Sequence, residues 1–467
     1  MSETPHQPPR DVPDPETSPE QADEPVAEPT PELPLLTLRD GLPDVTDTDE
    51  GLRAAAEAIA AGTGPVAIDA ERASGYRYSN RAYLIQLRRE GSGIWLIDPI
   101  GLSTLKPLQE ALEGAEWILH AATQDLPCLA EIGLTPTELF DTELAGRLLG
   151  HPRVGLATLV ETELGFRMKK EHSAVDWSTR PFPRPWLEYA ALDVEVLIEL
   201  QTSLKAQLAA AGKEEWARQE FAALRSFQPT VRKDAWRRTS GMHRIRGRRG
   251  LAAVRELWVT RDELAQGRDV TPGRIIPDSA IVAAATASPA DRENLLATKG
   301  FHGRGAGRYA AKWLAALKHA ASLDEADLPA RSPRGDGPPA PRAWIDRDPV
   351  AARRLSKARA DMATLSKQHQ IPVENLLTPD YLRRVLWTPP ETRDPELLSD
   401  AVVEALRELG AREWQIGLTG PLVTEAILAA DQPLPQAAEA APESTEASAD
   451  QADESDEAEE VSPTDSA

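Results

Sequence analysis

The stretch PVAIDAERASGYRYSNRAYLIQLRREGSGIWLIDP, residues 65–99, contains three apolar runs separated by short polar turns. The runs are residues 65–71, 82–90 and 93–99, and Gly, Ser, Asn and Tyr stand between them. Val, Ile, Leu and aromatic residues in short runs bounded by turn residues are typical of strands. The stretch therefore predicts three β-strands that are joined as antiparallel hairpins.

The segments that follow these three strands complete a mixed α/β pattern. A helix-type segment, residues 105–114, precedes a fourth strand-type run at residues 116–122, and helix-like segments continue to about residue 210. From about residue 245 the apolar residues recur three and four apart, which indicates helices only. We therefore predict a mixed sheet flanked by helices, followed by all-α domains.

Composition shifts divide the chain into six parts. We expect an acidic Pro-rich tail (1–34), an α/β domain (35–228), a helical domain (240–321), a Pro- and Gly-rich linker (322–345), a second helical domain (346–430) and an acidic tail (431–467). The net charge is −23, of which residues 1–34 contribute −8 and residues 431–467 contribute −12. Both tails are polar, acidic and nearly free of aromatic residues, a composition typical of disorder.

A basic patch lies between the predicted α/β and helical domains. Residues 232–261 carry ten Lys/Arg residues against two acids, with Trp236 and Trp258 among them. Such a patch is either a solvated face or a surface that contacts phosphates, and we favour non-specific contact with the phosphates of a nucleic acid. The candidate nucleic-acid-binding residues are Arg237, Arg238, Arg244, Arg246, Arg248 and Arg249.

Several classes of protein are disfavoured by what the sequence contains. A single cysteine, Cys128, cannot form an intramolecular disulfide and fits a reducing compartment. No apolar stretch approaches the length that spans a bilayer, and the N-terminus lacks the pattern of a signal peptide. We expect a cytoplasmic protein, a monomer, with no membrane partner.

Acidic side chains stand where predicted elements end or begin. Asp69 and Glu71 share one face of the first strand, because strand side chains alternate. Asp125 follows the fourth strand, in the first turn of a helix that Thr123 can cap. Taken singly, these residues could be a surfacing strand end and an ordinary helix-start acid.

A helix predicted over residues 186–200 carries two further candidates. Tyr189 and Asp193 are four residues apart and so lie on one helical face, among apolar neighbours. An unpaired carboxylate in an apolar setting is costly, and a metal ion would remove that cost. A simple contact between Tyr189 and Asp193 on a solvated face is the alternative.

Together these residues resemble the three exonuclease motifs of the DEDD superfamily, in its tyrosine-bearing branch. The motifs are Asp69-x-Glu71, Asp125 at the end of HAATQD, and Tyr189-x-x-x-Asp193. The surrounding segments HAATQDL, LFDTELAGRLLG and SAVDWSTRPFPRPWLEYAALDV resemble ribonuclease D over roughly residues 60–210. The 240–321 block resembles the helicase-and-RNase-D C-terminal (HRDC) domain, and the 346–430 block would be a second one.

The resemblance implies an RNase H-like fold and metal-dependent 3′-to-5′ exonuclease activity that releases nucleoside monophosphates. It implies two divalent cations, Mg²⁺ or Mn²⁺, held by Asp69, Glu71, Asp125 and Asp193, with Tyr189 orienting or deprotonating the attacking water; we favour orientation, because the ordinary pKa of a phenol, about 10, makes it a poor base. Oxygen ligands without cysteine suit these ions. The implied partner is RNA, at the 3′ ends of structured molecules such as tRNA precursors, with no small-molecule organic cofactor.

Two other functions use the same features. A DNA 3′-to-5′ exonuclease of the proofreading or RecQ-associated type shares the acids, although the SAVDW segment and paired helical domains favour ribonuclease D. A non-catalytic RNA-binding adaptor would use only the helical domains. Binding alone does not require four converging acids, so the adaptor is the weaker alternative.

Overall fold

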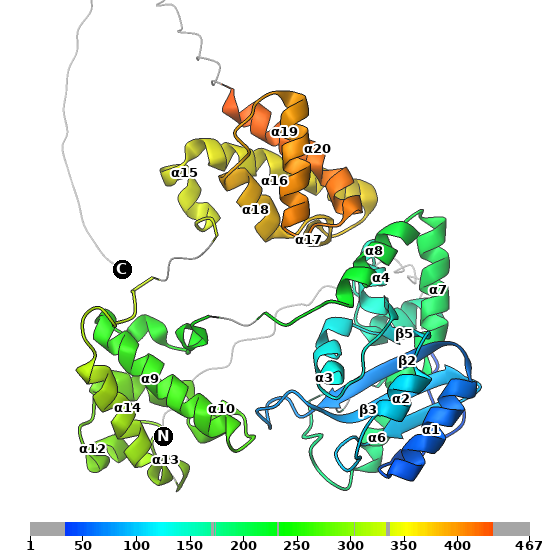
Figure 1. The fold of residues 1–467 in the computed structure, drawn as a ribbon, viewed down its shortest axis with the longest axis horizontal. Coiled ribbons are helices and arrows are strands. Elements are labelled where there is room, and N and C mark those ends of the chain that lie inside the picture. The colour runs from blue at the N-terminus through cyan, green and yellow to red at the C-terminus, as the bar shows by residue number, and fades with distance from the viewer. Residues whose placement is uncertain are drawn as a thin grey trace, which may run out of the picture.

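The structure is a computed structural model of the chain, and it describes residues 33–169, 172, 174–230, 233–302, 304–332 and 337–432. The predicted disordered tails, 1–34 and 431–467, lie almost wholly outside the described residues. One domain contains a sheet, and two helical domains follow it along the chain (Figure 1). No helix in the described ranges is both long and apolar enough to cross a membrane.

A six-stranded mixed sheet forms the centre of the first domain. Its strands are β1 (Val45–Thr46), β2 (Thr63–Arg72), β3 (Ala82–Glu90), β4 (Gly93–Ile97), β5 (Glu116–Leu119) and β6 (Glu138–Asp141). Their order is β1-β4-β3-β2-β5-β6, with β3 antiparallel to both of its neighbours, β2 and β4. The parallel pairs are β1 with β4, β2 with β5, and β5 with β6. The predicted hairpins are confirmed, whereas β1 and β6 were not anticipated.

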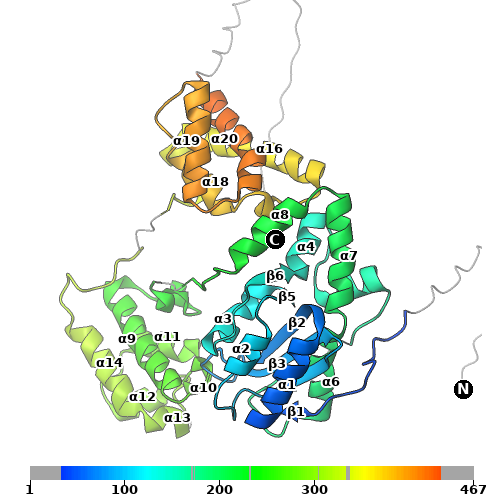
Figure 2. The same cartoon turned by 45° about the vertical axis from the view of Figure 1, so that its right-hand side comes forward.

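Helices cover both faces of this sheet (Figure 2). They are α1 (Asp49–Ala61), α2 (Lys106–Ala111), α3 (Leu126–Glu131), α4 (Thr142–Leu149), α5 (Leu156–Leu159), α6 (Arg184–Glu195), α7 (Leu197–Ala210) and α8 (Glu214–Leu224), with short turns η1 (Ala122–Gln124) and η2 (Val160–Leu164). Apolar side chains of α1 and α2 share one core with Val66, Ile68 and Leu87. Helix α6 packs across β2, β3 and β4 on the other face. Both sides of β2 are therefore buried, as its apolar run predicts.

The helix predicted over residues 186–200 is broken in the structure. Helix α6 ends at Glu195 and α7 begins at Leu197. The Arg88 guanidinium, from β3, donates to the Glu195 carbonyl oxygen across 2.6 Å and to the Glu199 carboxylate at 2.8 and 2.9 Å. This buried arginine satisfies a carbonyl at the break, so a continuous helix is not needed there. The periodicity contained no sign of this long-range contact.

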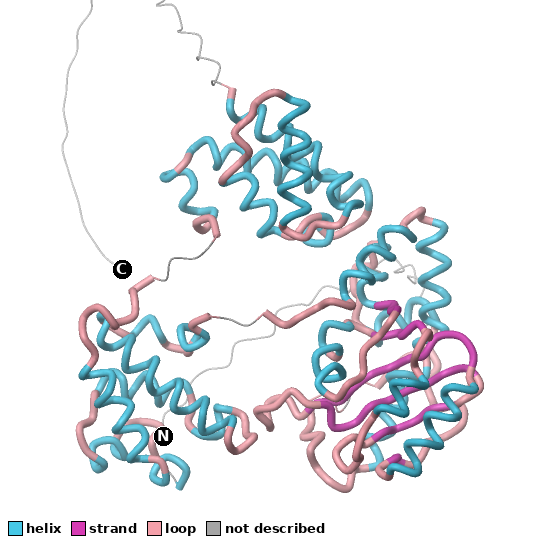
Figure 3. Tube along the Cα trace, viewed as in Figure 1, coloured by secondary structure: helices cyan, strands magenta, loops and turns pink. Residues whose placement is uncertain are grey.

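The second domain, like the third, contains no strand within the described ranges (Figure 3). Its elements are η3 (Ala235–Arg238), η4 (Met242–Arg244), α9 (Gly247–Gln266), α10 (Pro272–Ile275), α11 (Asp278–Ala287), α12 (Arg292–Ala297), α13 (Arg304–Arg308) and α14 (Ala310–Ser322). They enclose a separate apolar core around Trp236, Phe301 and Trp313. The predicted all-α character of this block is confirmed.

The third domain is also helical and packs against the first. It consists of η5 (Pro341–Ala343), α15 (Trp344–Arg347), α16 (Pro349–His369), α17 (Val373–Leu376), α18 (Pro379–Trp387), α19 (Pro395–Glu408) and α20 (Glu413–Asp431). The Trp216 ring of α8 stacks on the Trp414 ring of α20, with centroids 5.0 Å apart. The Trp414 indole also donates to Glu220 at 3.0 Å. A continuous apolar cluster therefore joins these two domains.

Candidate active site and nucleic-acid interface

Three carboxylates converge where β2 ends beneath α6. Asp69 and Glu71 extend from the same face of β2, near its C-terminal end. Asp193 reaches this face from α6, which packs across it. Carboxylate oxygens of the three residues all lie within 4.8 Å of one another. Glu71 and Asp193 are each only 9% exposed, so the cluster is largely shielded from solvent.

Asp125 reaches the same edge of the sheet from the neighbouring strand. Strand β5 runs parallel to β2, so both strands end at the same edge. Beyond β5 the chain turns at Ala121 and passes through η1, and Asp125 stands at the N-cap of α3. The prediction that Thr123 caps this helix is wrong, because Thr123 lies inside η1. The Asp125 carboxylate is 5% exposed and lies 3.8 Å from the Arg72 guanidinium.

Asp141 holds the turn that leads to Asp125, and sequence reasoning did not assign it this role. Its carboxylate accepts hydrogen bonds from the backbone N–H groups of Ala121 at 3.2 Å and Ala122 at 2.8 Å. It also caps α4 by accepting from the N–H groups of Glu143 and Leu144. Ala121 has a φ of 57°, a left-handed conformation that is unfavourable for alanine. The position of Asp141 between a strand and a helix predicts that it caps α4, but no local pattern predicts its contact with the turn at Ala121.

Burial and mutual repulsion disfavour the ionised form of the clustered acids. Burial, followed by the charges of the three other acids, raises the pKa of Glu71 to about 10. Burial raises the pKa of Asp69 to about 6, and a backbone hydrogen bond and Arg72 oppose the shift. The pKa values of Asp125 and Asp193 are also raised, first by burial and next by the charge of Asp69. A cation between these groups would remove the repulsion.

Tyr189 accompanies Asp193 on α6, as predicted from their spacing. Its hydroxyl hydrogen-bonds the Asp193 carboxylate. Burial and the neighbouring charges of Asp193 and Glu71 raise the pKa of the phenol. A phenol with a raised pKa stays protonated at neutral pH, and it can therefore donate a hydrogen bond but not act as a base.

The donor set fits hard divalent cations. The converging atoms are carboxylate oxygens, which Mg²⁺ and Mn²⁺ prefer. The nearby softer ligands have other uses: the His120 Nδ1 lies 2.9 Å from the Thr142 hydroxyl, and the Cys128 thiol donates to the Asp125 carbonyl. Burial lowers the pKa of His120 to about 4, which keeps this ring neutral. The residues present therefore fit the metal site that the sequence predicts.

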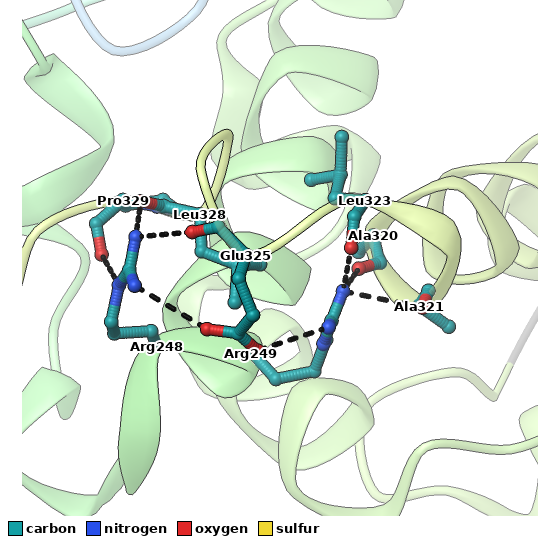
Figure 4. Close-up of polar contacts among 8 residues, drawn as sticks. All are labelled: Arg248, Arg249, Ala320, Ala321, Leu323, Glu325, Leu328 and Pro329. Atoms are coloured by element: carbon teal, nitrogen blue, oxygen red, sulfur yellow. Dashed lines mark hydrogen bonds and ion pairs between the residues drawn. The ribbon is translucent and has the colours of Figure 1, made fainter.

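The six arginines of the basic patch fall into two groups. Arg248 donates to the carbonyls of Leu328 and Pro329, and Arg249 to that of Leu323 (Figure 4). Both also pair with the Glu325 carboxylate. The Arg237 guanidinium pairs with Asp234 and lies over the Trp236 ring. These three side chains hold the helical domain together. The side chains of the exposed residues Arg238, Arg244 and Arg246 have no hydrogen-bonded or ionic partner within the described ranges.

The second domain contacts the loop that follows β2, an arrangement that the sequence did not reveal. The Tyr78 hydroxyl donates to Asp262 on α9 at 2.9 Å. The Ser79 N–H donates to Asp269 at 2.8 Å, and the Arg274 guanidinium lies over the Tyr76 ring. This loop begins directly after β2, so the helical domain rests within a few residues of Glu71.

The fold and the acid cluster define a 3′-5′ exonuclease domain followed by helical domains. Residues 43–209 match the 3′-5′ exonuclease family, residues 250–317 the HRDC domain, and residues 337–427 the 3′ to 5′ exonuclease C-terminal domain. Whether the 346–430 block is a second HRDC domain stays a prediction.

Curated relatives are ribonucleases D. The chain is 32% identical to the ribonuclease D of Zymomonas mobilis, and the match covers 58% of this chain and 70% of that protein. It is 35% identical to that of Acidiphilium cryptum over 48% of this chain, and the match spans 58% of that protein's length. The chain belongs to the ribonuclease D family.

Solved structures agree with this assignment. A protein from Bifidobacterium adolescentis is 37% identical, with a TM-score of 0.77 over 85% of this chain and 100% of that one. Escherichia coli RNase D, described as an exoribonuclease involved in structured RNA processing, is 26% identical. Its TM-score is 0.60 over 78% of this chain and 98% of that one.

Proposed function

We propose that the chain is a metal-dependent 3′-to-5′ exoribonuclease that releases nucleoside monophosphates from RNA. The observation that carries the proposal is the convergence of Asp69, Glu71 and Asp193, with oxygens within 4.8 Å of one another. Asp125 and Tyr189 stand beside this cluster, and its buried charges require compensation. Membership of the ribonuclease D family supports RNA as the substrate.

In this mechanism Asp69, Glu71, Asp125 and Asp193 would hold two divalent cations, Mg²⁺ or Mn²⁺. Such ions, when bound, activate the attacking water and stabilise the charge on the leaving 3′-oxygen. Tyr189 keeps its proton and orients the water through its hydroxyl, while its hydrogen bond to Asp193 fixes the phenol. The water gives up one proton to solvent as its oxygen bonds to phosphorus, and the bond from phosphorus to the 3′-oxygen of the preceding nucleotide breaks. That oxygen takes up a proton, and a nucleoside 5′-monophosphate leaves.

The proposed natural substrates are structured RNAs with 3′ extensions, such as tRNA precursors. The three exposed arginines, Arg238, Arg244 and Arg246, would contact phosphates of the body of such an RNA. The single buried cysteine fits action in the cytoplasm. We propose that the protein acts as a monomer, since all the acids of the site come from one chain.

End-labelled oligomers test the activity. RNA and DNA of one sequence, labelled at either end, would be incubated with wild type, Asp69→Asn and Glu57→Gln, an exposed carboxylate on α1 that serves as the control. With wild type and Glu57→Gln, we expect the 3′-label to be released as a mononucleotide and the 5′-labelled oligomer to shorten stepwise. We expect neither result with Asp69→Asn or in the presence of EDTA. Activity in EDTA, or in Asp69→Asn, would overturn the metal mechanism.

The same assay separates the alternatives. Faster hydrolysis of DNA than of RNA would favour the DNA exonuclease, and RNA binding without hydrolysis would favour the adaptor. A tRNA precursor with a short 3′ extension, compared with an unstructured RNA of equal length, tests the substrate class. We expect the extension to be removed and the folded body to remain.

A further inference from the structure

Gln86 is a fully buried glutamine with an unpartnered amide. Its side chain is 0% exposed, and neither Oε1 nor Nε2 has a hydrogen-bond partner within the described ranges. Leaving a buried polar group unpaired costs about 1–3 kcal/mol. Packing alone therefore does not explain why a glutamine occupies this position in the centre of the sheet.

The register of the sheet places Gln86 opposite Asp69. In the antiparallel pair of β2 and β3, Gln86 is the direct cross-strand partner of Asp69. Such partners extend from the same face, with Cβ atoms about 4.5–5.5 Å apart. The amide therefore emerges on the face where Asp69, Glu71 and Asp193 meet.

The side chains that flank Gln86 on β3 and β4 offer it no acceptor, unlike Asp69 on β2. Its cross-strand partner on β4 is Leu96, and the next side chains along β3 on the same face are Leu84 and Arg88. Leu84 and Leu96 are apolar, and Arg88 donates to Glu195 and Glu199. Among these neighbours only Asp69 carries an acceptor for the Nε2 group.

We propose that Gln86 is a positioning residue whose Nε2 group donates a hydrogen bond to the Asp69 carboxylate when the acids hold their cations. Carboxylates that bind metal ions are themselves held by hydrogen bonds, which fix their orientation. One Asp69 oxygen faces the cations and the other accepts from Gln86. This inference rests on the proposed metal site and adds a residue that binds no metal itself.

The test compares metal affinity with stability in the protein without RNA. Mn²⁺ alone is titrated calorimetrically into EDTA-stripped wild type, Gln86→Met and Gln201→Met, and each is melted without metal. Methionine keeps the length of glutamine and removes the amide. Gln201 is the matched control, because it is also buried and donates to Glu116 at 2.8 Å, away from the acids.

The two variants should behave in opposite ways. Gln86→Met should weaken Mn²⁺ binding by about tenfold or more. Its metal-free melting temperature should stay equal to wild type or rise, since an unpaired buried amide is gone. Gln201→Met should melt earlier, because it loses a hydrogen bond, and should bind Mn²⁺ as wild type does.

Three results would overturn the inference. Wild-type Mn²⁺ affinity in Gln86→Met would show that the amide has no role in the site. A weakening that Gln201→Met shares would show a general effect of lost stability. Absence of Mn²⁺ binding in wild type would instead overturn the proposed metal site as well. Gln86→Leu, which also lacks the amide, replaces Gln86→Met if the latter does not fold.

Discussion

The Tyr78 hydroxyl donates to the Asp262 carboxylate across 2.9 Å, and this bond joins the loop after β2 to helix α9 of the HRDC domain. The same loop is held by Asp269, which accepts from the Ser79 N–H. On the other side of the loop, the Arg77 guanidinium donates to the Ser178 hydroxyl, in the segment that leads to α6. The HRDC domain thus contacts a loop that follows β2, the strand of Asp69 and Glu71, and that is also bonded to the segment before α6, the helix of Asp193.

Breaking this bond should loosen the domain contact. We expect Tyr78→Phe and Asp262→Asn each to lower the free energy of unfolding, with a coupling between them of about 0.5–1.5 kcal/mol in a double-mutant cycle. Glu263→Gln, on the neighbouring exposed position of α9, is the control and should leave stability unchanged. Additive effects of Tyr78→Phe and Asp262→Asn would show that the bond does not contribute in solution.

Removing the Tyr189 hydroxyl should separate turnover from binding. Tyr189→Phe keeps the ring on α6 but cannot orient the water, and a misplaced nucleophile costs about a hundredfold in rate. We expect kcat to fall by that order while RNA affinity, measured in EDTA, is unchanged. Tyr381→Phe in the third domain is the control. Wild-type rates in Tyr189→Phe would contradict the proposed role.

The metal-free protein should lose stability as pH rises. Asp69 and Glu71 have folded pKa values raised to about 6 and about 10, from ordinary values of 3.8 and 4.5. A raised pKa means that the folded state binds the proton more tightly, so this stability is fully present below about pH 4 and lost as pH rises through about 6 and about 10. Melting in EDTA between these limits should show the decline.

Two further arms make this pH prediction specific. Mn²⁺ should restore the melting temperature at high pH, because the cation stabilises the ionised acids. Glu71→Gln removes a side chain whose pKa is raised to about 10, so its decline in EDTA should be smaller than that of wild type. A melting temperature of the metal-free wild type that does not fall with pH would contradict the repulsion between these acids.

The hairpins and the pairing of the clustered acids within one strand or helix were predictable because their signals are local. The β2–β4 hairpins follow from apolar runs and turn residues, and the shared face of Asp69 and Glu71 follows from strand alternation. Tyr189 and Asp193 follow from helical spacing. The DEDD resemblance then joined segments that periodicity alone could not bring together.

What could not be predicted depends on contacts between distant segments. The break after Glu195 is stabilised by Arg88, more than a hundred positions earlier, and no local pattern encodes that bond. The short strands β1 and β6 consist of two and four residues, too few for a period to appear. The separate roles of the arginines likewise depend on which carbonyls lie nearby, as Arg248 shows.

Asp141 should influence the site through the turn that precedes Asp125. Asparagine in its place keeps one carbonyl acceptor but presents an amide to a buried N–H, which costs about 1–3 kcal/mol. We expect Asp141→Asn to lower both the melting temperature and kcat, with RNA affinity in EDTA unchanged. Asp291→Asn is the control, because Asp291 caps α12 far along the chain by accepting from the Asn294 N–H at 2.9 Å. Wild-type kcat in Asp141→Asn would show that the turn does not depend on this carboxylate.

We expect the arginines of the basic patch to fall into two functional groups, according to whether their side chains are bonded within the domain. Arg238, Arg244 and Arg246 are exposed, so replacing all three by Gln should weaken RNA binding without changing the melting temperature. Each lost phosphate contact should reduce the slope of log affinity against log salt by about 0.7 for single-stranded RNA. The slope should therefore fall by about 2 if all three bind phosphates.

Arg248 should behave differently, because its donors bind Leu328, Pro329 and Glu325. Arg248→Gln removes the contacts that join the start of α9 to the chain after α14, and we expect a lower melting temperature with an unchanged salt slope. Fluorescence anisotropy at several salt concentrations, paired with melting curves, separates the two groups. If Arg248→Gln lowered the salt slope and the triple variant did not, RNA would bind Arg248 rather than the three exposed arginines, and Arg248 would have to leave its carbonyl partners to do so.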